Sequence, residues 1–340
     1  MDLTEDERAK IALFTNVPKK AVITALDAKN SIYDIPMMLL DENLDQIVIE
    51  RLGLQDKAVR PADLSDWEEV VDRLVNTEHE VTVGMVGKYV DHADAYKSLS
   101  EAITHGGLRG RIKVNIVTFE SEDFSAGDMS GLDDIDAVIV PGGFGERGFE
   151  GKVNAIRYAR EKGIPYLGIC YGMQAAAVEF ARNVCGLENA NTTENDPDTP
   201  HPVIGLITEW RDDSGAVERR SEDSDLGGTM RLGGQECQLQ EGSLSRELYG
   251  RDVIRERHRH RYEFNNRYRE TFTNHGMVLA GHSMDGSLVE IIEIADHPWF
   301  VGCQFHPEFT STPRDGHPLF TGFIEAALRV QQGIAVKGAA

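Results

Sequence analysis

The chain has 340 residues, of which 41% are apolar, so it can bury a sizeable core, and its glycine and proline contents exclude a collagenous or low-complexity protein. No apolar run approaches the ~18 residues of a membrane span, and the charged N-terminus lacks the apolar stretch of a secretion signal, which together indicate a cytoplasmic protein. The net charge of −22 disfavours nucleic-acid binding and, with 24 arginines against 11 lysines, fits either an ordinary acidic enzyme or one adapted to high salt.

The first 75 residues differ from the rest of the chain and predict a small appendage. A short apolar run at 11–14 is a candidate strand. A helix is expected to begin at Leu64 or Ser65, with an apolar face formed by Val70, Val71 and Leu74. The segment is too short and too interrupted to form a complete domain with its own chemistry, and residues 76–80 are the expected linker.

Residues 81–332 predict an α/β domain, because apolar runs typical of buried strands alternate with helical segments. Strands are expected at 81–86, 113–119, 136–143, 164–170, 286–294 and 300–308. One helix is expected to run from an N-cap at Asp94 to His105 and to stop at Gly106 and Gly107. A second helix is expected to end at Lys162, before Gly163, and two more are expected at 173–184 and 318–330. The pattern predicts a mainly parallel central sheet with helices on both faces, whose active site lies at the C-terminal ends of the strands. Short strands and hairpins are expected at 186–270, and a frayed tail at 333–340.

The strongest local signal is GICYG at 168–172, between an expected strand and an expected helix. Two glycines permit a tight turn that lifts the side chain of Cys170 clear of the sheet. A thiol there lies at a helix N-terminus, where the dipole favours the nucleophilic thiolate. The four cysteines form no C-x-x-C pair and no zinc pattern, so we expect no metal site. We predict that Cys170 is a nucleophile, although a lone cysteine is more often a core residue.

A glycine-rich segment, PGGFGERG at 141–148, follows another expected strand. Successive glycines expose backbone N–H groups that can stabilise the oxyanion of a tetrahedral intermediate. A plain β–α turn would also contain glycines. The spacing of a phosphate-binding P-loop is absent both here and in GMVGKY at 84–89. The combination with GICYG therefore favours an oxyanion hole.

The third signal is CQFHPEF at 303–309. In an extended segment alternate side chains share a face, so His306 and Glu308 are expected to lie side by side, with Pro307 stiffening the step between them. A carboxylate beside an imidazole fixes its tautomer and stabilises its charged form, as the base of a cysteine nucleophile requires. A surface turn with a solvated histidine is the alternative. No comparable partner pattern is found for His258, His260, His275, His282 or His317.

With these three motifs in this order, the chain resembles the class I glutamine amidotransferases. Longer segments resemble the CTP synthase family in particular, over residues 4–330: ENANTTE, ITEWRD, DLGGTMRLG and RHRHRYEFN are among them. The resemblance implies a glutamine-hydrolysing domain at 81–332 and, at 1–75, the incomplete C-terminal tail of the synthase domain. In that family the released ammonia serves the amination of UTP to CTP, which requires ATP and Mg²⁺, whereas glutamine hydrolysis needs no cofactor.

Carried over by motif, the resemblance makes Cys170, His306 and Glu308 a catalytic triad and Gly143 part of the oxyanion hole. The L-glutamine site would be lined by Tyr171, Gly172, Met173, Gln174, Glu194 and Arg261. The last two have the charges needed to bind the α-amino and α-carboxylate groups of the substrate. The family has leucine where Tyr171 stands, a departure that leaves the catalytic logic intact.

The resemblance also implies nucleotide contacts and partners. Residues 209–233 resemble the family's lid, where GTP is an allosteric activator, so Arg219 and Arg220 are candidate contacts, although a solvated hairpin would explain either one. Lys10 would lie near the nucleotide sites of an intact enzyme, which is a homotetramer. The UTP, magnesium and phosphate-loop residues of the synthase domain are not recognisable, so we expect a fragment that hydrolyses glutamine and does not make CTP alone.

Two alternatives remain open. One is another amidotransferase or hydrolase of the triad class, such as one serving GMP or anthranilate synthesis, which the 209–233 segment and the RHRHRYE strand disfavour. The other is a non-catalytic subunit or interaction module, which the missing synthase residues favour and the intact triad disfavours.

Overall fold

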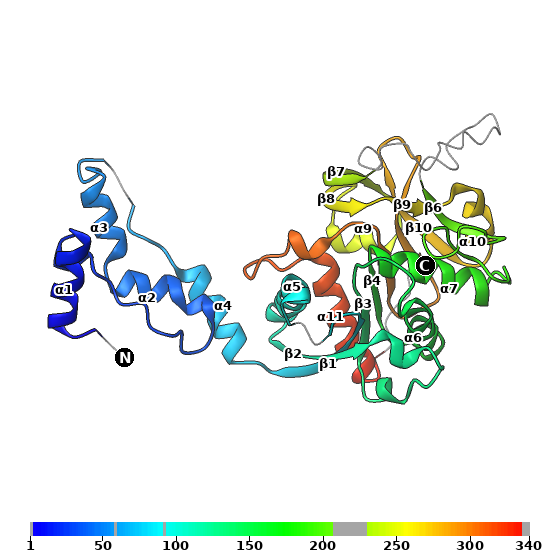
Figure 1. Cartoon of the computed structure of the whole chain (residues 1–340), viewed down its shortest axis with the longest axis horizontal. Helices are drawn as coiled ribbons and strands as arrows, with labels where there is room; N and C mark the ends of the chain where they lie inside the picture. The colour runs from blue at the N-terminus through cyan, green and yellow to red at the C-terminus, as the bar shows by residue number, and fades with distance from the viewer. Residues whose placement is uncertain (1–2, 58–59, 91–92, 207–229, 335–340) are drawn as a thin grey trace. The chain divides into compact units, whose positions relative to one another are not determined.

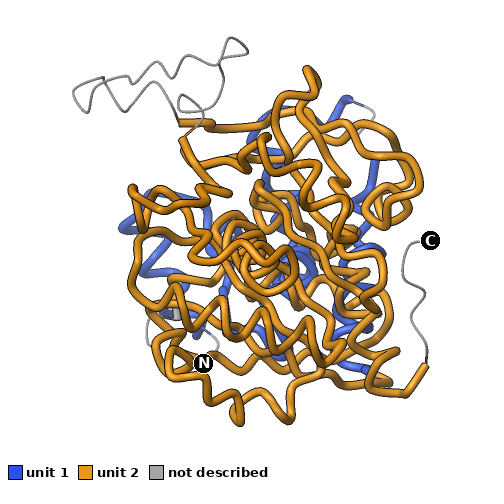
Figure 2. Tube along the Cα trace, turned by 90° about the vertical axis from the view of Figure 1, so that its right-hand side faces the viewer, with its two compact units in different colours: residues 1–77 blue, residues 78–340 orange. Residues whose placement is uncertain are grey.

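The computed structural model describes residues 3–57, 60–90, 93–206 and 230–334. The chain forms two compact units, Met1–Thr77 and Glu78–Ala340, which Figure 2 shows in separate colours. The division falls inside the segment expected to be a linker, but His79 and Glu80 of that segment already belong to a strand of the second unit. Within the described residues, no helix is both long and apolar enough to cross a membrane.

The described part of the first unit is helical, and its four α-helices are α1 (Glu5–Thr15), α2 (Ile35–Asp41), α3 (Leu44–Arg51) and α4 (Ser65–Val75). The expected strand at 11–14 is wrong, because these residues form the second half of α1. A capping box starts that helix: the hydroxyl of Thr4 accepts from the backbone N–H of Glu7, whose carboxylate accepts from the N–H of Thr4. The expected helix from residue 65 is confirmed as α4, in which Val70 is buried.

The described part of the second unit is built on a nine-stranded sheet in the order β2-β1-β3-β4-β12-β11-β10-β7-β8. Its parallel half consists of β1 (His79–Gly87), β2 (Ile112–Glu120), β3 (Ala137–Val140), β4 (Tyr166–Ile169) and β12 (Phe300–Cys303). Antiparallel pairing adds β11 (Val289–Ile294), β10 (Met277–Ser283), β7 (Arg231–Leu239) and β8 (Val253–His260). A small second sheet contains β5 (Asn191–Thr192), β6 (Pro202–Leu206) and β9 (Tyr262–Phe264).

Helices cover both faces of the large sheet (Figure 1), as the sequence predicts. One face packs against α5 (Lys97–Leu108) and α11 (Pro318–Gln331), and the other against α6 (Phe149–Lys162) and α7 (Tyr171–Asn183). Two short helices, α9 (Leu244–Tyr249) and α10 (Arg269–Asn274), lie in the antiparallel half. Alternate residues of β3 enter different cores: Ala137 and Ile139 join the side of α5 and α11, and Val138 and Val140 the side of α6 and α7.

The boundaries of α5 differ from the prediction. Asp94 lies in a 3-10 turn, Ala93–Tyr96, and is not the N-cap of the helix. The helix also continues through Gly106 and Gly107, because these glycines serve close packing rather than termination. A Cβ atom would lie 2.7 Å from the carbonyl oxygen of Phe320 at Gly106, and 2.3 Å from that of Ile112 at Gly107. Gly163, by contrast, ends α6 in the left-handed conformation, as expected.

Candidate active site

Three chain segments meet at the C-terminal edge of the parallel strands. They are the turn 141–145 after β3, Cys170 after β4, and residues 304–308 after β12. The strands β3, β4 and β12 are neighbours and run in the same direction, so their C-terminal ends lie at one edge of the sheet. The motifs singled out in the sequence are thereby brought together, at the position where α/β sheets carry their active sites.

Cys170 occupies a strained turn between β4 and α7. Its backbone angles, φ 51° and ψ −101°, fall in a region that residues other than glycine rarely adopt. The flanking glycines permit the turn: a Cβ at Gly172 would lie 2.1 Å from the carbonyl oxygen of Val140, and a Cβ at Gly168 would lie 2.8 Å from the carbonyl carbon of Gly172. The thiol is therefore presented at the N-terminus of α7, in the geometry of a nucleophile elbow.

His306 and Glu308 are hydrogen-bonded, with 2.8 Å between Nδ1 of the imidazole and Oε1 of the carboxylate. The expected contact is present, but the expected reason for it is wrong. The strand β12 ends at Cys303, and Pro307–Phe309 forms a 3-10 turn that brings the carboxylate back to the ring. The backbone N–H of His306 donates to the carbonyl of Arg257 on β8 at 2.8 Å, which anchors the turn to the sheet.

The charge state of His306 is set by its two neighbours. Burial lowers its pKa, whereas hydrogen bonds to Cys170 and Glu308 and the negative charges of both groups raise the pKa, to about 10. Because Nδ1 is engaged by Glu308, Nε2 is the nitrogen left for the thiol. The hydrogen bond to Glu308 thus holds the imidazole beside Cys170, in the order nucleophile, base and orienting carboxylate.

The sequence analysis missed Gly142, which allows His306 to approach Cys170. A Cβ atom at this position would lie 2.8 Å from Cε1 of His306 and 3.6 Å from Cβ of Cys170. The signal for it was the doubled glycine of PGGFG, of which only Gly143 was singled out. Gly142 therefore provides the space that the imidazole occupies beside the nucleophile.

Replacing Gly142 with alanine is expected to lower kcat of the reaction at Cys170 by about 10²-fold, because the added methyl group displaces the imidazole from the thiol. Steady-state kinetics would measure this, and circular dichroism would check the fold. Gly186→Ala is the control: it strains a turn with φ 68° and open space around it, so it should reduce stability and leave kcat unchanged. Wild-type kcat in Gly142→Ala would contradict the assigned contact.

A pocket of about 300 Å³ adjoins the thiol, at the lower end of the range for small-molecule sites. Five of the predicted residues line it: Gly143, Cys170, Gln174, Glu194 and Arg261. Five others that the sequence analysis did not select also line it: Phe144, Met230, Arg259, His260 and Tyr262. The pocket thus has a carboxylate and two guanidinium groups in its wall.

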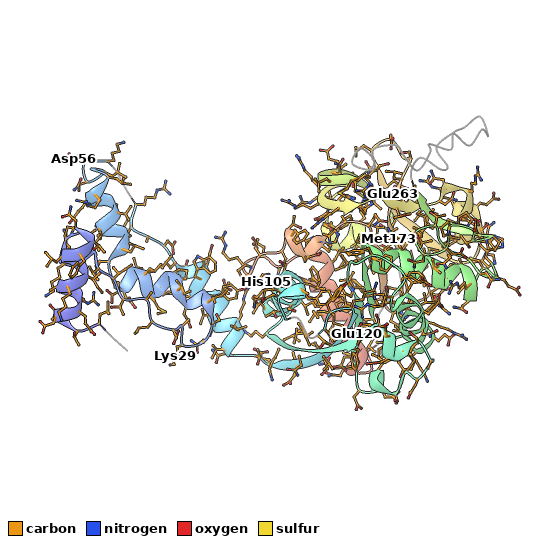
Figure 3. The ribbon with its side chains drawn as sticks, viewed as in Figure 1. Lys29, Asp56, His105, Glu120, Met173 and Glu263 are labelled. Atoms are coloured by element: carbon orange, nitrogen blue, oxygen red, sulfur yellow. The ribbon has the colours of Figure 1, made fainter. Side chains whose placement is uncertain are left out.

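Three predicted glutamine-site residues do not line this pocket. Tyr171 is buried behind the turn 141–145, where its hydroxyl donates to the carbonyl of Gly145 at 2.7 Å. Gly172 provides the close approach of α7 to β3. Met173, labelled in Figure 3, is fully buried and lies against Gly302. These residues follow the nucleophile along a helix that faces the core, so the motif that contains them supports the site from behind.

Gln304 is a further site residue that the sequence analysis missed. Its fully buried side chain donates from Nε2 to Sγ of Cys170, at 3.7 Å. Its Oε1 accepts from Nε2 of Gln174 at 3.2 Å, and the same nitrogen donates to the carbonyl of Tyr262 at 3.0 Å. Gln174 therefore holds Gln304 against the sulfur as well as lining the pocket.

Glu194 connects the pocket to the glycine turn. Its Oε1 accepts a hydrogen bond from the backbone N–H of Gly145 at 2.8 Å. Burial raises the pKa of Glu194, while that hydrogen bond and the charge of Lys88 lower it. Since Glu194 and Arg261 both line the pocket, opposite charges are available for the two ends of an α-amino acid.

Two histidines expected to lack partners belong to a buried charge cluster. His258 and His260 on β8 lie 2.8 Å apart, from Nδ1 to Nε2, and His260 Nδ1 lies 3.4 Å from Glu263 (labelled in Figure 3). Arg231 bridges Glu263 and Glu290 at 3.2 and 2.7 Å. Burial raises the pKa of Glu263 to about 8 and lowers the pKa of His258 to about 3. His258, His260 and Glu263 are close in the sequence, but Arg231 and Glu290, which complete the cluster, come from β7 and β11.

His317 also has a partner that the sequence did not indicate. Its Nε2 lies 2.9 Å from Oε1 of Glu256, whose Oε2 accepts from the hydroxyl of Thr310 at 2.8 Å. Thr310 directly follows the 3-10 turn that contains Glu308. This network therefore braces the turn that holds the carboxylate against His306.

The roles of the three candidate nucleotide contacts stay predictions. Lys10 is exposed on α1 of the first unit, and Arg219 and Arg220 lie outside the described residues. The described residues contain no group of three or more His, Cys, Asp and Glu side chains that could hold a metal ion.

Comparisons with known proteins bear on the family. The sequence matches Glutamine amidotransferase class-I over residues 91–326 and CTP synthase N-terminus over residues 1–54. The CTPS glutaminase domain of Trypanosoma brucei with bound acivicin is 32% identical, with a TM-score of 0.65, and the match covers 73% of this chain and 94% of that one.

Two other solved structures are too distant to inform the assignment. A candidate GMP synthase protein from Thermoplasma acidophilum is 17% identical, with a TM-score of 0.45, over 75% of this chain and 98% of that one. A glutamine amidotransferase from Thermotoga maritima is 13% identical, with a TM-score of 0.41, over 74% and 98%. The chain belongs to the CTP synthase family, as a class-I glutamine amidotransferase domain preceded by a segment that matches the CTP synthase N-terminus.

Proposed function

We propose that this chain hydrolyses the side-chain amide of L-glutamine in the cytoplasm and releases ammonia and glutamate. The observation that carries the proposal is the hydrogen-bonded pair His306–Glu308, which lies beside Cys170 and a pocket with charges of both signs. The pocket would bind the α-amino group near Glu194 and the α-carboxylate near Arg261, which leaves the amide end of the substrate for the thiol.

The first half of the reaction forms a thioester. The thiolate of Cys170 attacks the amide carbon, and the C=O π electrons move to oxygen, where the backbone N–H of Gly143 stabilises the oxyanion. The imidazolium of His306 gives its proton to the departing nitrogen. The C–N bond breaks, and ammonia leaves a γ-glutamyl thioester on the sulfur.

The second half regenerates the enzyme. Neutral His306 takes a proton from water, whose oxygen attacks the thioester carbon, and the resulting oxyanion again lies near Gly143. The C–S bond then breaks, so glutamate leaves and the thiolate–imidazolium pair is restored. Glu308 keeps one ring nitrogen engaged throughout, which directs the other towards the sulfur and stabilises the charged ring.

An assay of the purified chain for glutamate released from glutamine tests this proposal. We expect glutamate and ammonia in equal amounts, and little release from asparagine, because a side chain shorter by one methylene group does not bring its amide to the sulfur. Absence of glutamate release from a folded chain would contradict the proposal and would favour a non-catalytic interaction module.

We further propose that the ammonia serves the amination of UTP to CTP in a synthase domain. That step would require ATP and Mg²⁺ bound by the synthase domain, with GTP as an allosteric activator and a homotetramer as the assembled enzyme. The match of residues 1–54 to the CTP synthase N-terminus supports this partner. Mixing the chain with a separately expressed synthase domain should give glutamine-dependent CTP formation, whereas glutamate without CTP would indicate a glutaminase only.

A further inference from the structure

Lys88 is a buried cation that does not line the substrate pocket. It directly follows β1 and is 8% exposed. Its backbone is fixed by Tyr96, whose hydroxyl accepts from the Lys88 N–H at 2.9 Å and donates to the Lys88 carbonyl. Its ammonium group donates to the carbonyl oxygens of Phe144 at 2.7 Å and Gly145 at 3.1 Å. A buried charge is thus directed at two consecutive peptide groups of the turn that contains Gly143.

These contacts fix the orientation of the peptide between residues 144 and 145. In a planar trans peptide the carbonyl and the following N–H point in opposite directions. Lys88 binds the carbonyl of Phe144, and Glu194 accepts the N–H of Gly145 at 2.8 Å. The peptide plane is therefore held at both ends by opposite charges, and it cannot rotate without breaking both contacts.

The next peptide is held as well. The carbonyl oxygen of Gly145 accepts one hydrogen bond from the ammonium group of Lys88 and another from the hydroxyl of Tyr171, which lies 2.7 Å away. Gly145 has φ 73°, and a Cβ atom added to it would meet nothing within 4 Å, so neither its own chain geometry nor packing prevents it from adopting other angles. The turn depends on polar contacts for its conformation, and Lys88 supplies two of them.

We propose that Lys88 is a positioning residue for glutamine hydrolysis, which orients the turn 141–145 so that the N–H of Gly143 faces the developing oxyanion. The proposal rests on the proposed function. Lysine suits this role because an ammonium group has three donors and can bind several carbonyls at once. Burial and the charge of Arg147 lower the pKa of Lys88, while Glu194, Glu122 and Glu120 raise it.

The test compares two reactions of the same sulfur in the full chain with Lys88→Met. Hydrolysis of glutamine passes through an oxyanion, whereas alkylation by iodoacetamide is a direct displacement of iodide by the thiolate and forms none. We expect kcat for glutamine to fall at least about 10-fold, less than the 10²–10³-fold typical of removing an oxyanion donor outright. KM and the rate of Cys170 alkylation should change less than about threefold, and Lys88→Arg should restore part of kcat.

Lys152→Met is the matched control. Lys152 is also a buried lysine, 2% exposed, but its ammonium donates to the hydroxyl of Ser121 at 3.0 Å. This variant should lose stability and keep its kcat. If Lys88→Met does not fold, Lys88→Gln, which retains an amide donor, takes its place in the same comparison.

Wild-type kcat in a folded Lys88 variant would overturn the proposal. A parallel loss of kcat and alkylation rate would also overturn it, because that result indicates general damage to the site. A wild-type chain that is alkylated at Cys170 but releases no glutamate would contradict the proposed function itself, and with it the role of Lys88.

Discussion

Replacing Cys170 with alanine is expected to reduce kcat for glutamine hydrolysis by at least about 10⁴-fold, because no other group at the site can form the acyl intermediate. The fold should be retained, since alanine removes only the sulfur atom and leaves the flanking glycines in place. Glutamate release would be followed at saturating glutamine, and the melting temperature would be compared with that of the wild-type chain.

Cys185→Ala is the control for this variant. Cys185 follows α7 and is half-buried, and burial raises its pKa to about 11, so it is a poor nucleophile at neutral pH. We expect its replacement to leave kcat unchanged. Substantial turnover in Cys170→Ala, or a loss of turnover in Cys185→Ala, would contradict the assignment of the nucleophile.

The second large effect is expected for Glu308→Gln. The amide cannot supply the negative charge that stabilises the imidazolium, so kcat/KM should fall by about 10² to 10⁴-fold. The pKa of His306, about 10 with Glu308 in place, should also decrease, because Glu308 is one of the groups that raise it. The alkaline limb of the pH profile of kcat/KM, which reports the free enzyme, should therefore move to lower pH.

The charge of His306 also affects the stability of the fold. The folded pKa of His306 lies above its ordinary value of 6.5, so the charged ring stabilises the fold fully below about pH 6.5 and loses this contribution as the pH rises through about 10. In the Glu308→Gln variant, the free energy of unfolding should decrease less between about pH 6.5 and pH 10 than it does in the wild-type chain. An alkaline limb that stays in place in the variant would contradict the coupling of Glu308 to His306.

The sequence predicted the parallel half of the fold well because buried parallel strands appear as continuous apolar runs. The helix α6 and its end at Gly163 were also correct, since a helix stop by glycine is a local property. The strand at 11–14 was wrong because the apolar run was considered without the capping box that precedes it. Gly106 and Gly107 were misinterpreted as a helix stop because their role depends on residues outside the helix. Gly106 packs against Phe320, which is remote in the sequence, and Gly107 packs against Ile112 at the start of the next strand.

The site shows the same division between local and remote causes. Cys170, His306 and Glu308 were selected from motifs in which the neighbouring residues explain the geometry. Lys88 and Gln304 were not selected, because each acts on a segment that comes from another strand. The inference that residues after the nucleophile line the pocket failed for Met173, since only the structure shows which face of α7 is directed towards the core.

The most direct test of the central claim is to trap the acyl intermediate on Cys170. The chain would be mixed with radiolabelled glutamine, quenched rapidly in acid, digested and mapped for labelled peptides. We expect label on the peptide that contains Cys170, its release by hydroxylamine as expected for a thioester, and no label in Cys170→Ala. Rapid turnover with no labelled peptide, or label on the peptide that contains Cys303, would contradict the account.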